Sequence, residues 1–254
     1  MENIISVKDM TFEYVSIDSK FRAIDNLNLE VKQGEFVAII GHNGSGKSTL
    51  SKNLNAILVP TEGDIYIDGM NTKDEAKLWD IRQTAGMVFQ NPDNQIVATI
   101  VEEDVAFGPE NLGIEPKVIR QRVEESLKSV GIYELKDRQP HLLSGGQKQR
   151  GASARALITN PRIIFADEPT GALDSKSSKD LLISLKKANE SGNATILMVT
   201  HDAYSASYAK QVYMLSDGAI KCRLNHSGER QKFYDEILSL LASMGSEQEW
   251  VYLN

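Results

Sequence analysis

The chain has 254 residues with a formal net charge of −7, and 41% of its residues are hydrophobic. This length fits one large domain, or one domain with an inserted subdomain, and the acidic balance gives no reason to expect a nucleic-acid partner. The one cysteine, Cys222, excludes an internal disulfide and a cysteine-based zinc site, and it fits a reducing compartment.

The apolar runs and the first residues of the chain predict its location. No segment approaches about 18 consecutive apolar residues, the length at which a helix can span a membrane. Residues 1–3 lack the basic and apolar regions of a signal peptide. We therefore expect a cytoplasmic protein, or one that lies peripherally on the cytosolic face of the cell membrane.

Three strands are predicted before residue 41. Residues 4–14 and 27–31 alternate or are apolar, and a polar connection at 16–20 lies between them. The apolar run at 36–40 is typical of a buried strand. Tyr14 stands one strand ahead of a glycine-rich loop, where an aromatic ring can stack on an adenine base; an ordinary half-buried strand tyrosine is the alternative.

Residues 41–49 match the pattern of a phosphate-binding loop, between the strand 36–40 and a segment with helical spacing at 47–57. Glycines let backbone N–H groups turn toward a phosphate, the lysine reaches the β- and γ-phosphates, and the serine after it ligates Mg²⁺. The alternative, a glycine-rich turn with a chance lysine, is disfavoured by the flanking elements. The predicted nucleotide ligands are Gly41, His42, Asn43, Gly44, Ser45, Gly46, Lys47, Ser48 and Thr49.

The middle of the chain predicts short elements followed by a mainly helical region. The short elements are a turn at 60–63, a strand with a hairpin turn at 64–69, a helix at 74–82, a strand at 86–89 ending on Gln90, and a break at 91–95. Residues 101–131 are expected to be mostly helical, with Pro116 near a helix start and Gly131 at a helix end. An apolar stripe there predicts core packing by Val118, Ile119, Val123, Leu127 and Val130.

The second half of the chain alternates helices and strands. The expected elements are helix 147–159, strand 163–166, helix 177–190, strand 195–200, strands 211–215 and 219–223, and helix 232–244. Such alternation predicts an α/β fold with a largely parallel sheet and helices on both faces. Ligands of such sheets bind beyond the carboxyl ends of the strands.

Polar residues directly follow several of the apolar strands. Asp167 and Ser48 are suited to bind Mg²⁺, and Gln90 can reach the metal or an attacking water. Glu168 can orient or deprotonate that water, and His201 can hold the γ-phosphate. Each of them alone is most simply a turn residue at a strand end, but their convergence on one sheet edge predicts phosphoryl transfer to water.

A second anion-binding helix N-terminus is predicted at Ser144, Gly145, Gly146 and Gln147, ahead of the helix 147–159. One nucleotide hardly requires two such cradles on one chain. Two chains arranged head to tail use both, because each nucleotide then lies between the phosphate loop of one copy and this segment of the other. The segment therefore predicts two composite sites in a dimer.

Together these motifs resemble those of ATP-binding-cassette (ABC) transporter ATPases over nearly the whole chain. Residues 143–147, Leu-Ser-Gly-Gly-Gln, resemble the signature motif of that family, and residues 163–168 resemble its Walker B segment with the catalytic glutamate. The Q-loop glutamine, the D-loop, the switch histidine and the adenine-stacking aromatic of the family are matched by Gln90, Asp174, His201 and Tyr14.

The resemblance implies a P-loop NTPase with a RecA-like, mostly parallel sheet core, an N-terminal antiparallel β subdomain and an inserted α-helical subdomain. The implied ligands are ATP and Mg²⁺. The implied partners are transmembrane transporter subunits, gripped by the helical subdomain, and a second ABC ATPase copy or paralogue. The expected nucleotide-binding domain is 1–245, with core and antiparallel parts at 1–89 and 150–224, the helical subdomain at 90–149, a C-terminal helix at 230–245 and a tail at 246–254.

The resemblance to subfamilies is divided. Residues 88–95 and 107–113 resemble energy-coupling factor (ECF) importer ATPases, which power uptake of vitamins or metal ions. Residues 166–176, 200–210 and 230–245 resemble the ATPases of bacitracin-type peptide-antibiotic exporters. The pattern indicates a hybrid with a switch between about residues 146 and 163, whether natural, recombinant or an engineered chimera without a physiological partner. Because the helical subdomain is importer-like, uptake is the favoured function and export the alternative.

The sequence agrees less well with other classes of protein that contain the same ATPase cassette. Chromosome and DNA-repair ATPases insert long heptad-bearing coiled coils, and the sequence has none. Translation-associated cassette proteins have two cassettes in one chain, and this chain has one. A binding module without hydrolysis is disfavoured by the presence of both Glu168 and His201.

Overall fold

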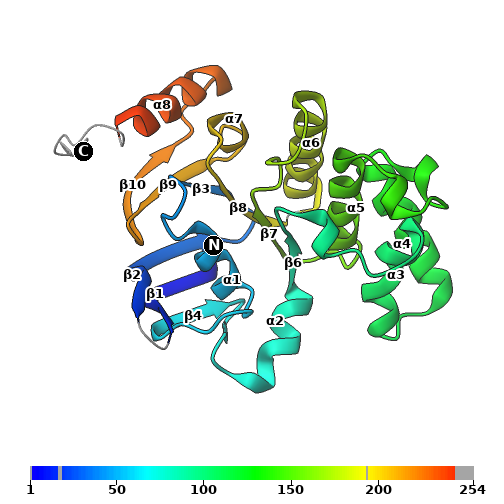
Figure 1. Ribbon diagram of the computed structural model, residues 1–254, viewed down its shortest axis with the longest axis horizontal. Helices are drawn as coiled ribbons and strands as arrows, with labels where there is room; N and C mark the ends of the chain where they lie inside the picture. The colour runs from blue at the N-terminus through cyan, green and yellow to red at the C-terminus, as the bar shows by residue number, and fades with distance from the viewer. Residues whose placement is uncertain (1, 17–18, 193, 244–254) are drawn as a thin grey trace.

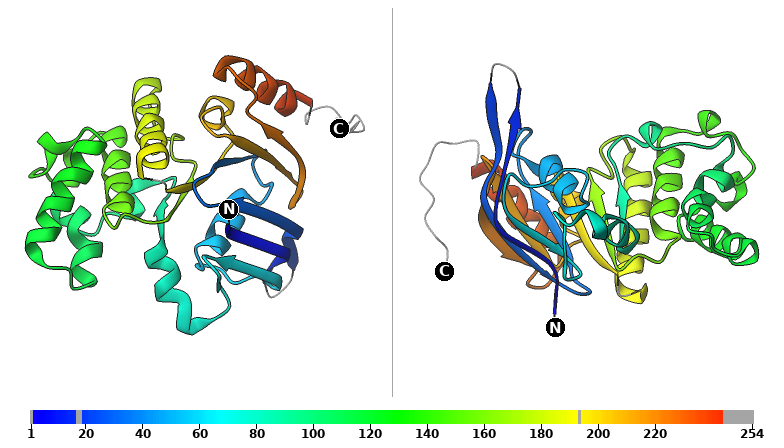
Figure 2. Two further views of the ribbon diagram at one scale, coloured as in Figure 1. Left: turned by 180° about the vertical axis from the view of Figure 1, so that it is seen from behind. Right: turned by 90° about the horizontal axis from the view of Figure 1, so that it is seen from below.

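The computed structural model describes residues 2–16, 19–192 and 194–243, which form two sheets and a lobe of helices (Figure 1). Met244, at the end of the last predicted helix, and the predicted tail 246–254 lie outside the described residues. The helical lobe lies at one end of the molecule, next to the β6 edge of the larger sheet, and the smaller sheet lies at the other end, beside β9 and β10 (Figures 1 and 2).

The larger sheet has six strands in the order β10-β9-β3-β8-β7-β6. Neighbouring strands from β9 to β6 run parallel, and β10 is antiparallel to β9. Every residue of β3, β7 and β8 is buried, as expected for central strands covered on both faces. The strands are β3 Phe36–Ile40, β6 Ala85–Val88, β7 Ile163–Asp167, β8 Thr195–Thr200, β9 Gln211–Ser216 and β10 Ala219–Asn225.

Side chains of β3 alternate between two hydrophobic cores. Val37 and Ile39 point into the core that includes α1 (Lys47–Leu54) and the smaller sheet. Ala38 and Ile40 point into the core that includes α6 (Ser175–Gly192), α7 (Ala203–Ala206) and α8 (Arg230–Ser243). Because successive residues of a strand face opposite sides, the side chains of this apolar run pack into the cores on both faces of the sheet. This packing holds β3 and the loop that follows it in place.

The smaller sheet is antiparallel, with the order β2-β1-β4-β5. Its strands are β1 Asn3–Val15, β2 Lys20–Lys32, β4 Glu62–Ile67 and β5 Met70–Asn71. The prediction that the second strand begins at residue 27 was wrong, because Phe21 pairs with Tyr14 and Lys20 pairs with Val15 across the hairpin. Backbone pairing with β1 therefore holds the polar start of β2 in an extended strand, and the hairpin projects from the body (Figure 2).

The helical lobe consists of α3 (Val101–Asn111), α4 (Pro116–Ser129) and α5 (Gly145–Leu157), which share one core. The predicted helical region 101–131 is divided in two, because Gly113 has a left-handed φ of 66° and Pro116 starts α4. Four residues of the predicted stripe are buried, but Val118 is 36% exposed and was wrongly assigned to it. The buried four are Ile119, Val123, Leu127 and Val130.

Several remaining elements differ from the prediction in length. The first helix ends at Leu54 rather than at residue 57, because Ala56 takes a left-handed φ of 51°. The short helix α7 was not predicted. The other elements are α2 Leu78–Thr84 and the 3₁₀ turns Glu75–Lys77, Pro92–Asn94, Tyr133–Leu135 and Pro140–Leu142. Within the described ranges, no helix is both long enough and apolar enough to cross a membrane.

Candidate active site

The phosphate loop connects the end of β3 to the start of α1, as predicted. Gly44 and Gly46 have φ values of 85° and 103°, a region that glycine adopts without steric cost. A Cβ atom on Gly41 would lie 2.2 Å from the carbonyl oxygen of Leu215, and one on Gly46 would lie 2.5 Å from that of Ala23. Only glycine therefore fits at these two positions, where the loop packs against β9 and β2.

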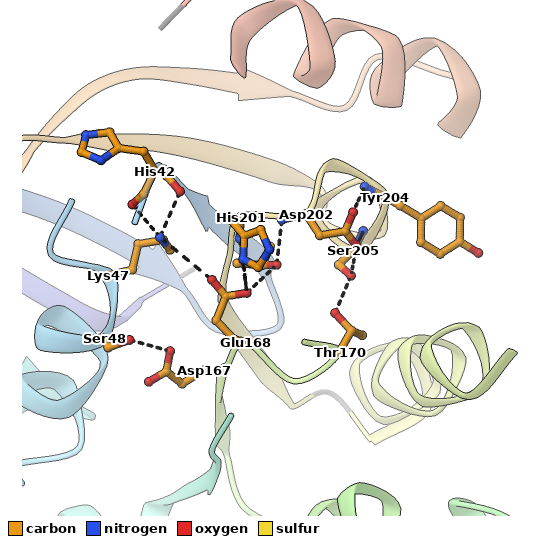
Figure 3. A network of polar contacts seen from close by, with 12 residues as sticks. His42, Lys47, Ser48, Asp167, Glu168, Thr170, His201, Asp202, Tyr204 and Ser205 are labelled. Carbon is orange, nitrogen blue, oxygen red and sulfur yellow. Dashed lines mark hydrogen bonds and ion pairs between the residues drawn. The ribbon is translucent and has the colours of Figure 1, made fainter. Parts of the chain in front are cut away.

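Lys47 is the first residue of α1, and its ammonium group turns back into the loop. Its Nζ donates hydrogen bonds of 2.9 Å to the carbonyl oxygens of Gly41 and His42 and lies 4.0 Å from Oε1 of Glu168 (Figure 3). Burial lowers the pKa of Lys47, and the carboxylates of Glu168 and Asp167 oppose that shift. A buried ammonium held mainly by neutral carbonyls would gain from anionic phosphate oxygens.

Ser48 and Asp167 form the second contact between the loop and the sheet. The Ser48 hydroxyl donates a 3.1 Å hydrogen bond to Oδ1 of Asp167, the last residue of β7. Asp167 is 5% exposed, and burial raises its pKa, with a smaller contribution from Glu168 in the same direction. Hydroxyl and carboxylate oxygens are ligands that Mg²⁺ prefers, so this pair fits a magnesium site and a buried carboxylate would gain from the cation.

Glu168 and His201 meet across the ends of β7 and β8. Oε2 of Glu168 accepts hydrogen bonds from Nδ1 of His201 at 3.0 Å, from its backbone N–H at 3.3 Å and from the Thr200 hydroxyl at 3.2 Å. Glu168 is 6% exposed, whereas the imidazole of His201 is 55% exposed. The carboxylate is thus buried behind the imidazole, with Oε1 directed toward Lys47 (Figure 3).

The rest of the loop and Tyr14 lie around this centre. The Tyr14 and Thr49 hydroxyls are 3.2 Å apart, so the tyrosine ring lies beside α1 while remaining 42% exposed. The ring of His42 contacts the Asn43 carbonyl oxygen at 2.8 Å. The Ser45 hydroxyl is buried and has no hydrogen-bond partner among the described residues. The loop residues predicted to bind nucleotide therefore lie together, with an aromatic ring at their edge.

Gln90 lies near the Glu168 turn rather than in the contact between Ser48 and Asp167. It is exposed and comes two residues after the end of β6. A Cβ atom on Gly171 would lie 3.7 Å from its Nε2, and the N–H of Gly171 donates to the Glu168 carbonyl oxygen at 3.1 Å. The metal-binding role of Gln90 stays a prediction, and its position next to the loop after β7 is what the structure provides.

The segment 144–147 forms the N-terminus of α5, at a distance from the phosphate loop. Ser144 and Gln147 make a reciprocal capping box, with hydrogen bonds of 3.3 and 2.9 Å. Ser144 and Gly145 are exposed, and Gly146 packs so closely that a Cβ atom there would lie 2.9 Å from Oγ of Ser177. Within the described part of the chain, no hydrogen bond or ion pair joins this segment to residues 41–49.

Asp174 lies beside this segment, and its carboxylate is used locally. It accepts hydrogen bonds from the backbone N–H groups of Lys176 and Ser177 at 3.0 Å and from the Ser177 hydroxyl at 2.6 Å. The Ser177 hydroxyl is the main cause of the lowered pKa of Asp174. The side chain therefore caps α6 within one chain, and its predicted contact with nucleotide remains untested.

The comparisons with known proteins identify the family. A family model described as "ABC transporter" matches residues 24–171. The chain belongs to the ABC transporter family. This ABC chain is similar to the energy-coupling factor transporter ATP-binding protein EcfA1 of Clostridioides difficile. The two are 64% identical over 218 residues, which cover 86% of this chain and 79% of that protein. The EcfA1 protein of Bacillus subtilis is 43% identical over 215 residues, covering 85% and 76% of the two chains.

Solved ABC structures agree with this assignment. The ATP-binding cassette MJ0796, in a dimeric post-hydrolysis state bound to ADP and Pi, has a TM-score of 0.82 at 37% identity, covering 89% of this chain and 100% of that chain. The cbiO1 protein of Clostridium perfringens, part of the ABC transporter complex cbiONQ, has a TM-score of 0.81 at 34% identity, covering 94% and 92%. The predicted P-loop fold class and the predicted enzyme class, an ABC-type ATPase, are confirmed.

The match to EcfA1 bears on the predicted hybrid. Because 218 residues match in a chain of 254, at most 36 residues lie outside the match. The match therefore extends across residues 146–163, where a switch of subfamily was expected, into the segment 166–176. An ABC ATPase with ECF-type relatives is confirmed, whereas an exporter-type second half and a chimera have no support from these relatives.

Sequence reasoning missed four residues that surround Glu168 and His201 in this ABC ATPase: Thr200, Asp202, Ser205 and Thr170. Asp202 caps α7 by accepting from the N–H groups of Tyr204 and Ser205. An aspartate just after a strand is a common N-cap residue and could have indicated this helix start. The contact between Thr170 and Ser205 has no such local signal, because it joins residues that are distant in the sequence.

Proposed function

We propose that this chain is the ATP-hydrolysing subunit of an ECF-type importer, attached peripherally to the cytosolic face of the membrane and powering uptake of vitamins or metal ions. The observation that carries the hydrolytic part is the meeting of Lys47, Asp167, Glu168 and His201 at the carboxyl ends of β3, β7 and β8. The transporter class is supported by 64% identity to an ECF transporter ATP-binding protein.

Nucleotide binding is assigned to the phosphate loop and Tyr14. Phosphate oxygens of ATP would replace the carbonyl oxygens of Gly41 and His42 as acceptors from Lys47, while loop N–H groups and the N-terminus of α1 add further donors. Tyr14 is exposed beside Thr49, where its ring is available to an adenine base. Binding therefore uses groups that the fold already holds in place.

Magnesium is assigned to Ser48 and Asp167, with Gln90 as a further oxygen ligand. The observed contact between Ser48 and Asp167, together with the burial of that carboxylate, supports the assignment. When bound, the ion neutralises charge on the β- and γ-phosphates. The two residues would then exchange their mutual hydrogen bond for contacts to the ion.

Glu168 is assigned the general base. Its Oε2 is occupied by His201 and Thr200, whereas Oε1 faces Lys47 and the mouth of the phosphate loop, where a water can bind between it and a phosphate. Removing a proton from that water generates the nucleophile. The exposed imidazole of His201 is assigned the contact with the γ-phosphate, and its hydrogen bond to Glu168 supports a role in orienting that carboxylate.

The working form is assigned as a head-to-tail dimer with two composite sites. In one chain, Ser144 caps α5 in the helical lobe, so in the proposed dimer a second copy or paralogue supplies it to the nucleotide. The exposed N-terminus of α5 is suited to a phosphate. The related cassette MJ0796 is dimeric in its post-hydrolysis state with ADP and Pi bound. Asp174 adjoins this surface and would lie in the dimer interface.

The helical subdomain, expected at 90–149, is assigned the contact with transmembrane subunits. Its importer-like segments 88–95 and 107–113 support an ECF scaffold as the partner. The second candidate, the ATPase of a bacitracin-type exporter or a chimera of the two types, is supported only by the resemblance of residues 166–176, 200–210 and 230–245.

Co-purification separates the two candidates. The tagged chain is expressed with the membrane scaffold of the C. difficile ECF transporter or, in parallel, with a bacitracin-type exporter permease, and each complex is extracted in detergent. We expect stoichiometric recovery of the ECF scaffold and none of the exporter permease. Recovery of the exporter permease alone would reverse the assignment.

A further inference from the structure

Beyond the contact between Glu168 and His201, four hydrogen bonds connect five residues from Glu168 to Thr170 and join the ends of β7 and β8. The Thr200 hydroxyl donates to Glu168 at 3.2 Å and accepts from the N–H of Asp202 at 3.1 Å. The Asp202 carboxylate accepts from the Ser205 hydroxyl at 2.6 Å, and the Ser205 and Thr170 hydroxyl oxygens are 2.9 Å apart. Thr170 is connected back to Glu168 through the chain (Figure 3).

Proton counting fixes the direction of these bonds. A carboxylate can only accept, so Ser205 donates its one hydroxyl proton to Asp202. Thr170 must then donate to Ser205, and the chain runs from Thr170 through Ser205 to Asp202. Thr170 is 8% exposed and Ser205 is fully buried, so water does not readily replace either partner. The hydrogen bond between Thr170 and Ser205, called the bridge below, therefore requires a hydroxyl group at both positions.

The bridge acts on a strained part of the backbone. Glu168 has a left-handed φ of 47°, which is unfavourable for a residue with a side chain and persists only where surrounding contacts hold it. Its N–H donates to the Val199 carbonyl oxygen at 2.8 Å, and its own carbonyl accepts from Gly171. The Thr170–Ser205 bond is the contact that ties the outer part of this turn to α7.

We propose that Thr170 and Ser205 are positioning residues for ATP hydrolysis, which hold the loop after β7 against α7 so that the Glu168 carboxylate stays aligned with His201. The inference rests on the proposed roles of Glu168 and His201 but concerns different residues. Neither Thr170 nor Ser205 touches the phosphate loop, so they act on turnover through Glu168 and leave nucleotide binding unchanged.

Steady-state hydrolysis by the full chain tests the bridge. Thr170→Val and Ser205→Ala each remove one hydroxyl, and we expect kcat to fall about tenfold, since small misplacements of a catalytic group cost this much or more. The KM for Mg-ATP should stay within about twofold, because the binding groups are untouched. The double variant should be no slower than either single variant, since both break the same bridge. Thr170→Ser keeps the hydroxyl and should restore kcat.

Matched controls separate positioning from general loss of stability. Thr195→Val removes a buried hydroxyl that accepts from the Gly34 N–H, at the opposite end of β8 from Thr200. Ser207→Ala removes a buried hydroxyl bonded to the Tyr204 carbonyl at the end of α7, and it tests loosening of α7 without loss of the contact to Thr170. Rates are divided by the active fraction, measured as ATP bound per chain. The bridge variants must be slower than these controls; equal rates, or losses that multiply in the double variant, would overturn the inference.

Glu168→Gln, measured alongside, distinguishes this inference from the proposed function. If Glu168→Gln abolishes turnover while Thr170→Val hydrolyses like Thr195→Val, then the bridge is structural only and the proposed function stands. If Glu168→Gln retains turnover, the assigned base is wrong, and the positioning argument falls with it.

Discussion

Glu168 is held between two different groups, the ammonium of Lys47 at 4.0 Å and the imidazole of His201 at 3.0 Å. The two carboxylate oxygens of Glu168 therefore have different partners. Oε2 is fixed by hydrogen bonds, and Oε1 faces the loop where the phosphates would bind. Single substitutions at the ends of the strands should therefore separate hydrolysis from binding.

Glu168→Gln should lower kcat by about 10²–10⁴-fold, the usual contribution of a general base, while ATP affinity persists. The amide is the same size but takes up a proton poorly, so binding groups stay in place. Hydrolysis is followed by phosphate release and affinity by titration calorimetry. Glu75→Gln, at an exposed position in a 3₁₀ turn, is the matched control. Near-normal turnover in Glu168→Gln would remove Glu168 from its role.

Lys47→Ala should abolish tight ATP binding, because the ammonium is the one positive side chain that the loop buries. Removing it also leaves the carbonyl oxygens of Gly41 and His42 without their donor. Calorimetry of ATP binding measures the loss, with the exposed Lys221→Ala as control. An affinity equal to that of the unmodified chain would contradict the cradle assigned to residues 41–49.

Asp167→Asn should stabilise the nucleotide-free chain at neutral pH. Burial raises the pKa of Asp167 in the folded state, so the folded chain holds that proton more tightly than the unfolded chain. This difference in proton binding stabilises the folded chain at pH values below the pKa that Asp167 has in the unfolded chain. The stabilisation is lost as pH rises through the raised pKa of Asp167 in the folded chain. The amide avoids this loss, and Tm should rise by about 2–4 °C for each kcal/mol regained.

The pH dependence checks the cause of that gain. The difference in Tm between Asp167→Asn and the unmodified chain should shrink as pH falls through the raised pKa, because both side chains are then neutral. The exposed Asp137→Asn should show no such trend. A difference that is independent of pH would mean that burial of charge is not its source. The same variant should lose magnesium-dependent ATP binding.

At the scale of elements, those whose conformation is decided by their own sequence were predicted, and those decided by contacts with distant residues were missed. Strands β3 and β8 were predicted to the residue. Strand β3 is an apolar run that leads into the glycine-rich loop, and β8 is an apolar run between two threonines that ends just before His201. The first part of β2 was missed, because pairing with β1 decides its conformation against a polar sequence. Likewise the phosphate loop could be predicted from its glycines, but the contact between Thr170 and Ser205 arises only when β7 and β8 lie side by side.

The segment after Gln90 is fastened to α5 by a buried polar cluster. Arg155 donates to the backbone and side-chain oxygens of Gln95, and it lies 3.4 Å from Asp104, which also accepts from the N–H of Val97 at 2.7 Å. Burial lowers the pKa of Arg155, and Asp104 opposes that shift. Helix α5 and the segment after β6 are therefore held together by this cluster.

Arg155→Ala should lower the free energy of unfolding by about 3 kcal/mol, because it leaves a buried carboxylate and amide without their partner. Amide hydrogen exchange at residues 95–98 should accelerate with it. Lys128→Ala, which breaks the exposed pair with Glu124, should change neither quantity measurably. If exchange at residues 95–98 were unchanged in Arg155→Ala, that cluster would not be what holds this segment.

At the scale of the whole molecule, the two segments assigned to the nucleotide site lie in different parts of the fold. The phosphate loop leads into α1, and the capped N-terminus of α5 belongs to the helical lobe, which lies beside the β6 edge of the larger sheet (Figure 1). In the proposed dimer, a second chain turned head to tail would bring these two segments together twice. ATP would then favour the closed pair, because it would contact both chains only in that state.

Ser144→Arg should block pairing without harming binding by the single chain. The new side chain would fill the exposed N-terminus of α5, but it would not touch residues 41–49 of its own chain. We therefore expect ATP affinity of the monomer to be retained, and ATP-dependent association and hydrolysis to be lost. Lys148→Arg, one turn along the same helix, keeps its charge and its pairing with Asp93 and serves as the control.

The most direct measurement is analytical ultracentrifugation of the Glu168→Gln chain with and without Mg-ATP. Without the base, bound ATP persists, and the chain should sediment as a monomer alone and as a dimer with nucleotide, holding two ATP molecules per pair. A chain that binds ATP yet sediments as a monomer at every concentration would contradict a site shared between Lys47 of one copy and Ser144 of the other.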